Sequence, residues 1–233
     1  MVTKTTTIYL VRHAEAEGNV KEFFQGNTDT EITAQGRKQL EYLAERFREV
    51  PLDAVISSPF HRALETAKAV NAHHDLEIRT AYRLREINGG DWEGRAWSEL
   101  PSLYPAELDL WQNRMWEFCA PKGEAMKEVY SRMREMLQRI AVEYAGKTVA
   151  VVSHGCALRN FLCWVEFNDI TRLHDVGWAD NTAVSLVTCA VTETSRRWTL
   201  EFKNDASHLP EECSTLHHSQ WCRYETEKEE AAT

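Results

Sequence analysis

Three short segments of the chain contain a continuous apolar run that is followed by polar or charged residues. They cover residues 7–11, 53–58 and 149–153. A short continuous apolar run is typical of a strand that is buried on both faces, as in a parallel sheet covered by helices. Two more strands are predicted at 182–191 and 197–203, on either side of a polar turn.

The segments between these strands carry apolar residues at helical spacing. One helix is predicted between Thr33, a capping residue, and Pro51, and a second one over 59–72. A long amphipathic helix is predicted over 124–144, and a further helix begins at Gly155 or the next residue. Strands that alternate with helices predict an α/β fold.

Residues that can do chemistry follow the ends of the three apolar strands. Arg12 and His13 follow the first strand, Arg62 follows the second and His154 follows the third. Ligands of open α/β sheets bind outside the carboxyl ends of the strands, so these four side chains are expected to lie together. Arginine matches phosphate oxygens with paired donors, and neutral imidazole can act as a nucleophile. A single residue of this kind is usually structural or solvated, but four at three strand ends indicate a phosphoryl site.

The residues around these positions resemble a known family. The stretch VRHAEAEGN at 11–19 resembles the signature of the histidine phosphatase superfamily, in its phosphoglycerate mutase-like branch. Further stretches match in the family's order, at 25–36, 57–67, 84–94 and 152–155. The match runs from about residue 5 to about residue 209. Two departures are Ala14, where the family usually has glycine, and KGEA at 122–125, which only approximates its Gly-Gly-Glu-Ser.

The resemblance implies a three-layer α/β/α sandwich with a mostly parallel central sheet. No linker rich in Gly, Pro or Ser divides the 233 residues, so a single domain is expected. We assign it to 1–210, with a cap insertion at about 92–122, and expect 211–233 to form an acidic, loosely held tail. Aromatic residues are dense in the cap. Most are expected to pack in its core, with one or two rings touching the leaving group.

The resemblance also implies how the site works. His13 would be the nucleophile that becomes a phosphohistidine. A larger set of residues would hold the phosphoryl oxygens: Arg12, Asn19, Arg62, His154 and Gly155, the last through the N–H groups of its helix.

A carboxylate is also implied for proton transfer. Glu86 would protonate the leaving alcohol and then activate water. Glu15 and Glu93 are rivals, although an acid beside arginines more often orients them and Glu93 is expected to brace a turn. Burial would raise the pKa of Glu86 and nearby arginines would lower it, so the sequence leaves the direction open.

The charge and the cysteines limit the class of protein. The chain has a formal net charge of −9, whereas nucleic acids and anionic membranes favour a basic face, so neither is expected as a partner. The six cysteines form no CxxC pair, and the apolar run before Arg12 is too short for a signal peptide or a membrane span. The expected location is the cytoplasm, and the oligomeric state is left open.

Neither a metal nor a cofactor is expected at the phosphoryl site. The site is rich in Arg and His, whereas magnesium and manganese prefer oxygen ligands. The sequence has no P-loop and no dinucleotide-binding glycine motif. A weaker hypothesis is a zinc site in the tail, formed by Cys213, His217, His218 and Cys222.

Three functions fit these residues. The leading one is a phosphatase that hydrolyses a small phosphorylated metabolite. The second is a cofactor-dependent phosphoglycerate mutase, but such enzymes carry a paired-arginine cluster in a longer cap, whereas this cap has Arg95 and Arg114 singly. The third is a phosphate-recognising interaction protein without turnover, which the full set of catalytic residues disfavours. The sequence therefore favours hydrolysis and leaves the physiological substrate open.

Overall fold

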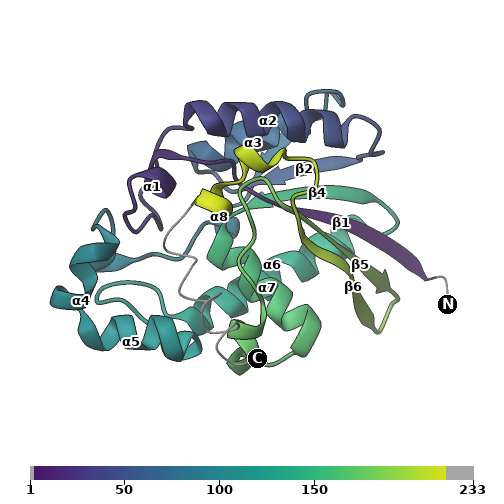
Figure 1. Cartoon of the computed structure of the whole chain (residues 1–233). Coiled ribbons are helices and arrows are strands. Elements are labelled where there is room, and N and C mark those ends of the chain that lie inside the picture. Colours follow the sequence, from purple (N-terminus) through teal and green to yellow (C-terminus); the bar gives the residue numbers. More distant parts are fainter. Residues whose placement is uncertain (1–2, 219–233) are drawn as a thin grey trace, which may run out of the picture.

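A single six-stranded sheet runs through the computed structural model, which describes residues 3–218 (Figure 1). The strand order is β3-β2-β4-β1-β5-β6. The first four strands in that order are parallel neighbours, and β5 and β6 add two antiparallel pairings at one edge. The strands are β1 (Lys4–Arg12), β2 (Ala54–Ser57), β3 (Ile78–Thr80), β4 (Thr148–Ser153), β5 (Val184–Val191) and β6 (Arg196–Asp205).

Helices cover both faces of this sheet. The α-helices are α1 (Glu17–Val20), α2 (Ala34–Phe47), α3 (His61–Val70), α4 (Leu100–Leu103), α5 (Pro105–Asn113), α6 (Met126–Glu143), α7 (Gly155–Phe167) and α8 (Thr215–His218). Short 3₁₀ helices lie at Tyr82–Leu84, Gly90–Trp92, Trp97–Glu99, Met115–Glu117, Ile170–Asp175 and Glu211–Cys213. Helices α2 and α3 pack on one face, and α6 and α7 on the other (Figure 1). The predicted three-layer α/β/α fold with a mostly parallel sheet is confirmed.

The pleat of β1 explains why its sequence is continuously apolar over residues 8–11. Ile8 and Leu10 belong to the core beneath α6 and α7, whereas Val11 belongs to the opposite core with Leu43 and Phe47 of α2. Successive side chains of a strand point to opposite faces, and both faces of this sheet are covered by helices. Apolar residues are therefore favoured at every position of this covered part of the strand.

The helix boundaries follow from local chemistry. The Oγ1 of Thr33 accepts a hydrogen bond from the backbone N–H of Gly36 at 2.9 Å, which caps α2 as predicted. Helix α3 begins at His61, two residues after Pro59, and α6 begins at Met126, two residues later than predicted. The strand β3 was not predicted, because its three residues are half-buried or exposed and show no alternation.

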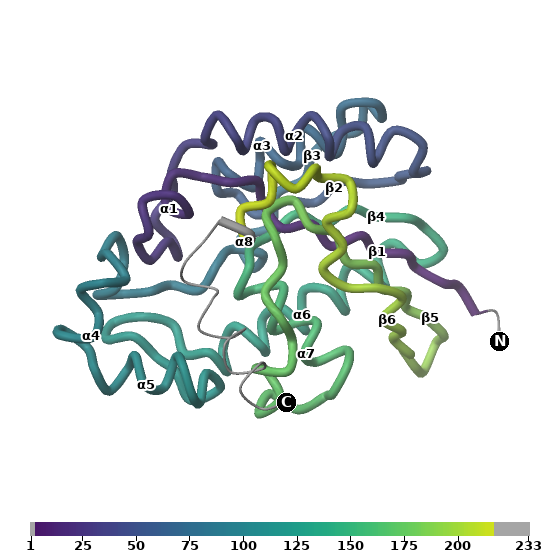
Figure 2. The backbone as a smooth tube through the Cα atoms, in the orientation of Figure 1, coloured from purple at the N-terminus to yellow at the C-terminus, as the bar shows by residue number. Residues whose placement is uncertain are grey.

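The predicted cap, at about 92–122, contains α4 and α5 and lies beside the carboxyl edge of the parallel strands (Figure 2). Trp92 is fully buried in its centre, where its ring packs on Phe24 and Phe118 with centroids 5.5 and 4.8 Å apart. This cluster anchors the cap to the core, so the expectation that most cap aromatics are structural fits Trp92. The division of the chain at residue 210 stays a prediction.

The start of the expected tail packs against the domain. Gln39 donates hydrogen bonds to the carbonyl of Cys213 at 2.8 Å and to Thr215 Oγ1 at 3.0 Å. Thr215 and Cys213 are buried. The prediction that the chain is loosely held from residue 211 onward is therefore wrong for 211–216.

Within the described residues, no helix is long and apolar enough to cross a bilayer.

Candidate active site

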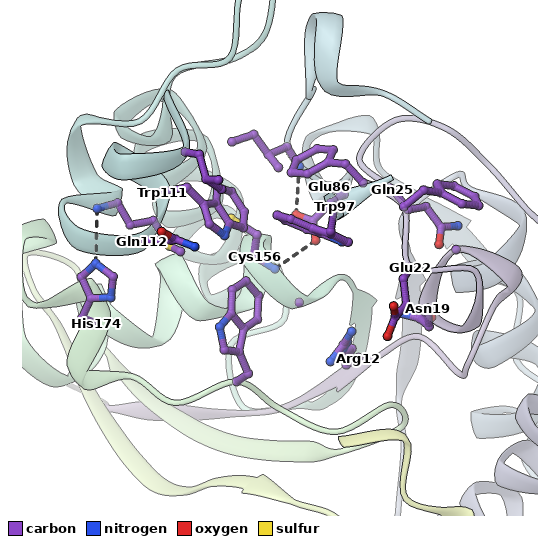
Figure 3. A pocket seen from close by; sticks show the side chains of 18 of the residues that line it. Arg12, Asn19, Glu22, Gln25, Glu86, Trp97, Trp111, Gln112, Cys156 and His174 are labelled. Atoms are coloured by element: carbon purple, nitrogen blue, oxygen red, sulfur yellow. Dashed lines mark hydrogen bonds between the residues drawn. The ribbon is translucent and has the colours of Figure 1, made fainter. Parts of the chain in front are cut away.

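A cavity of about 900 Å³ opens at the carboxyl ends of β1 and β4 (Figure 3). Its walls come from the start of the loop after β1, the segment around Glu86, the first turn of α7 and the cap. Five of the predicted site residues lie in this wall: Arg12, His13, Asn19, Glu86 and Gly155. The strand-end argument thus predicted residues that share one cavity, and their role as the active site stays a prediction.

His13 is held in one orientation by its neighbours. Its backbone N–H donates to the carbonyl of Ser153 at 3.0 Å, which ties the end of β1 to the end of β4. Its Nδ1 lies 2.8 Å from the carbonyl of Ala14. A carbonyl only accepts, so Nδ1 carries the proton and Nε2 keeps its lone pair. Burial, followed by the charges of Arg62 and Arg12, holds the pKa of His13 well below its usual range, so the ring is neutral at pH 7.

Ala14, where the family usually has glycine, fits without strain. Its φ is not among the positive values of the described chain, and its backbone N–H donates to Thr66 Oγ1 at 2.9 Å. The alanine at this position therefore needs no left-handed backbone conformation.

His154 and Arg62 stand behind His13 rather than in the cavity wall. Both are fully buried, and the rings of His13 and His154 have centroids 5.2 Å apart. His154 Nε2 lies 2.8 Å from Ser58 Oγ, and burial is the main cause that holds its pKa well below the usual range. The predicted group of four is therefore brought together, but two of its members do not line the cavity.

The guanidinium of Arg62 is fixed by the loop before α2. It donates to the carbonyls of Gly26 at 2.7 Å and Thr28 at 2.9 Å, and it pairs with Asp29 at 3.2 Å. Two side-chain nitrogens near His13 have no hydrogen-bond partner within residues 3–218. They are Nε of Arg62 and Nδ1 of His154. The Nε of Arg62 is a donor, and Nδ1 of the neutral His154 is a donor when its Nε2 accepts the hydrogen bond from the Ser58 hydroxyl.

Arg12, Gly155 and Asn19 form the wall nearest to His13. A Cβ at Gly155 would lie 3.3 Å from Arg12 Nε and 3.4 Å from the ring of Trp178, so the glycine lets both side chains approach the start of α7. Arg12 is buried and donates to the carbonyl of Ala179. The Oδ1 of Asn19 accepts from the backbone N–H of Ala16 at 3.0 Å, which leaves its amide nitrogen as the neutral donor that was predicted.

Glu86 is buried at the cavity wall and caps helix α7. Its carboxylate accepts backbone hydrogen bonds from Cys156 at 2.9 Å, Ala157 at 3.0 Å and Ile87 at 2.9 Å. The prediction that the N–H groups of this helix point at phosphate is therefore wrong for Cys156 and Ala157, whose donors are used by Glu86. Burial is the largest cause acting on the Glu86 carboxyl and raises its pKa, against the hydrogen bonds and Arg62.

The two rival acids lie outside the cavity wall. Glu15 accepts from Thr33 Oγ1 at 2.5 Å and from Thr215 Oγ1 at 2.9 Å, so it joins α2 to the C-terminal segment. Glu93 accepts from the backbone N–H groups of Asn27 at 2.7 Å and Thr28 at 2.9 Å. It braces the loop that holds Arg62, as a structural acid would.

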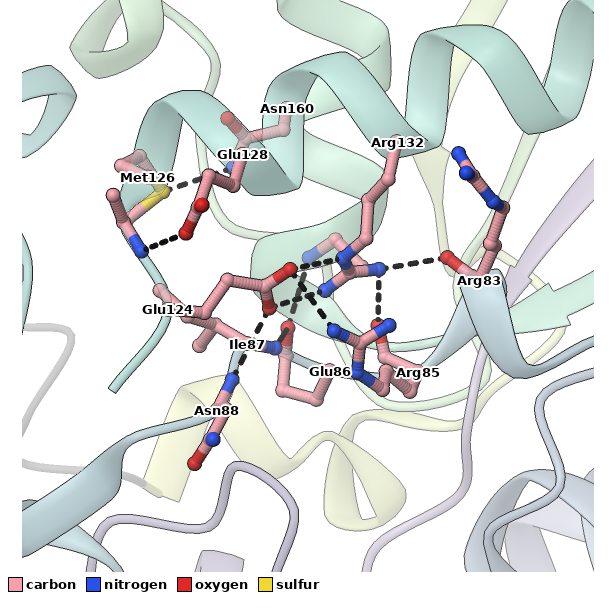
Figure 4. A network of polar contacts seen from close by, with 12 residues as sticks. Arg83, Arg85, Glu86, Ile87, Asn88, Glu124, Met126, Glu128, Arg132 and Asn160 are labelled. Atoms are coloured by element: carbon pink, nitrogen blue, oxygen red, sulfur yellow. Dashed lines mark hydrogen bonds and ion pairs between the residues drawn. The ribbon is translucent and has the colours of Figure 1, made fainter. Parts of the chain in front are cut away.

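A buried ion pair supports the segment that carries Glu86 (Figure 4). Glu124 accepts from Arg132 Nε at 2.6 Å and Nη2 at 3.0 Å, and Arg132 Nη1 donates to the carbonyls of Arg83 at 2.7 Å and Arg85 at 2.8 Å. Sequence analysis missed Arg132. The signal was its place three residues after Val129, on the buried stripe of a helix, where an arginine needs partners.

Comparison with known proteins assigns the family. A sequence model of the histidine phosphatase superfamily (branch 1) matches residues 8–206, which is most of the chain. The chain belongs to this superfamily. The resemblance inferred from the motifs around His13 and His154 is therefore confirmed.

Individual members of the histidine phosphatase superfamily align over most of their length. Phosphoserine phosphatase 1 of Hydrogenobacter thermophilus is 31% identical over 77% of this chain and 85% of its own. A probable phosphoglycerate mutase GpmB of Serratia proteamaculans is 36% identical over 65% of this chain and 70% of its own. The solved structure of Bacillus stearothermophilus YhfR superposes with a TM-score of 0.79 at 31% identity, covering 87% of this chain and 98% of that one.

The structure contains no group of three or more His, Cys, Asp or Glu arranged to hold a metal ion in the part of the chain that it describes. The tail hypothesis concerns Cys213, His217, His218 and Cys222. Cys213 is described and buried. Cys222 and the side chains of the two histidines lie outside the described residues, so the zinc hypothesis is not tested.

Proposed function

We propose that this protein is a phosphomonoesterase that transfers the phosphoryl group of a small phosphorylated metabolite to His13 and then to water. The observation that carries the proposal is that a neutral imidazole and a buried carboxyl line the same cavity. His13 supplies a free Nε2, and Glu86 has a raised pKa and so can carry a proton. These two groups are what phosphoryl transfer through a covalent intermediate requires.

In the first step, His13 Nε2 attacks phosphorus. The N–P bond forms while the bond from phosphorus to the ester oxygen breaks, and the electron pair of that bond goes to the leaving oxygen. Glu86 gives its proton to this oxygen, so the product leaves as an alcohol. The hydrogen bond from Nδ1 to the Ala14 carbonyl keeps the ring oriented while it becomes cationic.

In the second step, water replaces the alcohol. Glu86, now ionised, takes a proton from the water as its oxygen attacks phosphorus, and the N–P bond breaks. Inorganic phosphate leaves, and both His13 and Glu86 return to their starting protonation states. No metal is required, because the charge that develops on the phosphoryl oxygens can be met by fixed cationic and polar donors.

These donors surround His13. Arg12 and Asn19 line the cavity, and the buried donors Arg62 Nε and His154 Nδ1 stand next to the nucleophile. In phosphoryl transfer the negative charge spreads over the three equatorial oxygens, so several donors around one nucleophile stabilise the transition state together. Arg62 and His154 are proposed to act there from their buried positions.

The alternative is a phosphoglycerate mutase, the activity named for the GpmB relative. Such an isomerase must grip the carboxylate of its substrate. Among the described residues that line the cavity, Arg12 is the only arginine or lysine. Arg95 donates to the carbonyl of Asp91 at 2.8 Å, and Arg114 pairs with Glu117 at 3.1 Å, both outside the cavity wall. Hydrolysis is therefore favoured.

The proposed substrate is a small molecule of the cytoplasm. The formal net charge of −9 opposes binding to nucleic acid or to an anionic membrane surface. The cationic groups of the cavity are confined to its buried end, which suits a phosphomonoester that enters the pocket.

The test is a screen of phosphorylated metabolites for released phosphate, run beside a phosphoglycerate isomerisation assay. Wild type should release phosphate from at least one alkyl phosphomonoester, and His13→Ala should not. Isomerisation of phosphoglycerate without phosphate release would overturn the proposal in favour of the mutase.

A further inference from the structure

The cavity extends well beyond the residues that handle the phosphoryl group. Its volume of about 900 Å³ is near the upper end for small-molecule sites, whereas the alcohol part of a three-carbon phosphoester would fill only a fraction of it. Much of the remaining wall is aromatic and aliphatic, with contributions from Phe23, Phe24, Trp97, Leu108 and Trp111. Figure 3 shows Trp97 and Trp111 across the cavity from Arg12.

The tryptophans of this wall are fixed by the core behind them. The Trp111 ring packs against the buried Phe118 with centroids 4.8 Å apart, and against Trp97 at 5.8 Å. Trp178 lies nearly parallel to Trp111, at 6.2 Å and 25°. Trp97 and Trp111 are only half-buried and line the cavity. Rigid rings whose exposed faces border a cavity bind a flat partner without an ordering cost.

The charges in the lining argue against an acidic leaving group. Among the described lining residues, Arg12 at the phosphoryl end is the only arginine or lysine, whereas Glu22 and Asp175 add negative charge elsewhere. A carboxylate in the aromatic part would lose hydration without gaining a cationic partner. The amide of Gln112 offers both a donor and an acceptor at the same wall. An uncharged ring with polar edge atoms fits these groups.

We propose that the alcohol part of the substrate carries an uncharged heteroaromatic ring, as in a nucleoside or flavin monophosphate, which packs on Trp97 and Trp111. This inference rests on the proposed phosphatase activity and names the class of leaving group that the cavity selects. The phosphoryl group lies at His13, and the ring lies under the cap.

The test compares substrates that share one reacting group. Adenosine 5′-monophosphate, flavin mononucleotide and ribose 5-phosphate are all esters of a primary alcohol, and only the first two carry a heteroaromatic ring. With wild type, kcat/KM for at least one of the two should exceed that for ribose 5-phosphate by about tenfold or more, the value of one or two aromatic contacts.

Substitution of a cavity tryptophan tests which residue causes the preference for the ring-bearing substrate. Trp111→Leu should remove most of it by lowering kcat/KM for the ring-bearing substrate, while ribose 5-phosphate stays within about twofold. Trp164→Leu is the matched control, because Trp164 is a half-buried helical tryptophan that packs on Trp198 outside the cavity and should leave the ratio unchanged. Trp97→Leu provides a second variant if Trp111→Leu does not fold.

The outcomes separate the two proposals. Hydrolysis of ribose 5-phosphate with equal or higher kcat/KM than both ring-bearing esters would overturn the leaving-group inference and leave the phosphatase intact. Equal losses for all substrates in both Trp111→Leu and Trp97→Leu would also overturn it. Phosphate release from none of these three esters, together with release from another ester of the metabolite screen, would overturn this inference alone. Release from no ester of the screen would overturn the proposed function as well.

Discussion

The carboxylate of Glu86 accepts a hydrogen bond from the backbone N–H of Cys156 at 2.9 Å, in the first turn of helix α7. The residue that precedes this helix is His154. One helix start therefore fixes both the proposed acid and a proposed phosphoryl ligand. The hydrogen bonds and the helix dipole favour the ionised carboxylate, whereas burial favours the protonated acid and is the larger effect on the pKa.

The role of Glu86 as a proton donor predicts a dependence on the leaving group. Glu86→Gln should slow phosphorylation of His13 by about a hundredfold or more for an alkyl phosphate, because the alkoxide needs a proton as the bond breaks. An activated aryl phosphate should lose much less, since it expels a stable phenolate. Single-turnover kinetics isolate this step. Equal losses for both substrates would show that Glu86 only orients the site.

The same two groups predict the pH profile. The pKa of His13 lies below its ordinary value of 6.5, so the imidazole stays neutral when the pH falls somewhat below that value. The pKa of Glu86 lies above its ordinary value of 4.5, so the carboxyl stays protonated when the pH rises somewhat above that value. As pH rises through the Glu86 pKa, the acid is lost and kcat/KM for an alkyl substrate should fall. The maximum is therefore expected between the pKa of His13 and the pKa of Glu86.

The control for this profile is Glu86→Gln with the same substrate. Ionisation of the substrate phosphate affects both enzymes alike, so a fall on the alkaline side that is present in wild type and absent in the variant belongs to Glu86. An identical fall in both would contradict the assignment.

The Glu124–Arg132 ion pair is predicted to position Glu86. Glu124→Gln leaves Arg132 without its charged partner at a buried site, so the protein should lose about 3–5 kcal/mol of stability. Replacing both residues, as Glu124→Leu with Arg132→Met, should restore only part of the stability in thermal unfolding, because Arg85, whose Nη2 lies 3.2 Å from Glu124 Oε1, also loses its partner. Activity toward alkyl phosphates should stay low in the double variant, because the carbonyls of Arg83 and Arg85 have lost their donor.

The matched control is an exposed ion pair of the same helix. Glu143 pairs with Arg79 at 2.6 Å, and both side chains are about half exposed, so Glu143→Gln should change neither stability nor activity noticeably. Full activity in the Glu124–Arg132 double variant would limit this pair to a structural role.

The proposed chemistry also predicts independence from metal ions. The enzyme should keep its activity after exhaustive chelation, and vanadate should inhibit it as a mimic of the transferring group, because Arg12, Arg62 and the histidines meet the phosphoryl charge. Activity that disappears with chelation and returns with magnesium would contradict this.

The strand-end rule accounts for what the sequence could predict. Arg12, His13, Arg62 and His154 follow buried strands, and the topology of a parallel sheet brings such positions together. The main helices were predicted for a similar reason, because their apolar spacing reports the face that they bury. These features depend on periodicity along the chain.

Other features depend on contacts between side chains far apart in the sequence. The carboxylate of Glu15 binds Thr215, 200 residues away, and Glu86 uses the N–H groups that were expected to face phosphate. No periodicity reports such contacts. The half-exposed strand β3 was missed because only a buried strand imposes an apolar pattern.

The central claim is that His13 carries the phosphoryl group. Wild type mixed with a ³²P-labelled substrate and quenched in alkali should hold the label on His13, in a form that is stable to base and labile to acid. His13→Ala should hold no label and lose about a thousandfold or more in rate, as expected when covalent catalysis is removed. Label on a serine or cysteine, or turnover by His13→Ala at the wild-type rate, would contradict the account.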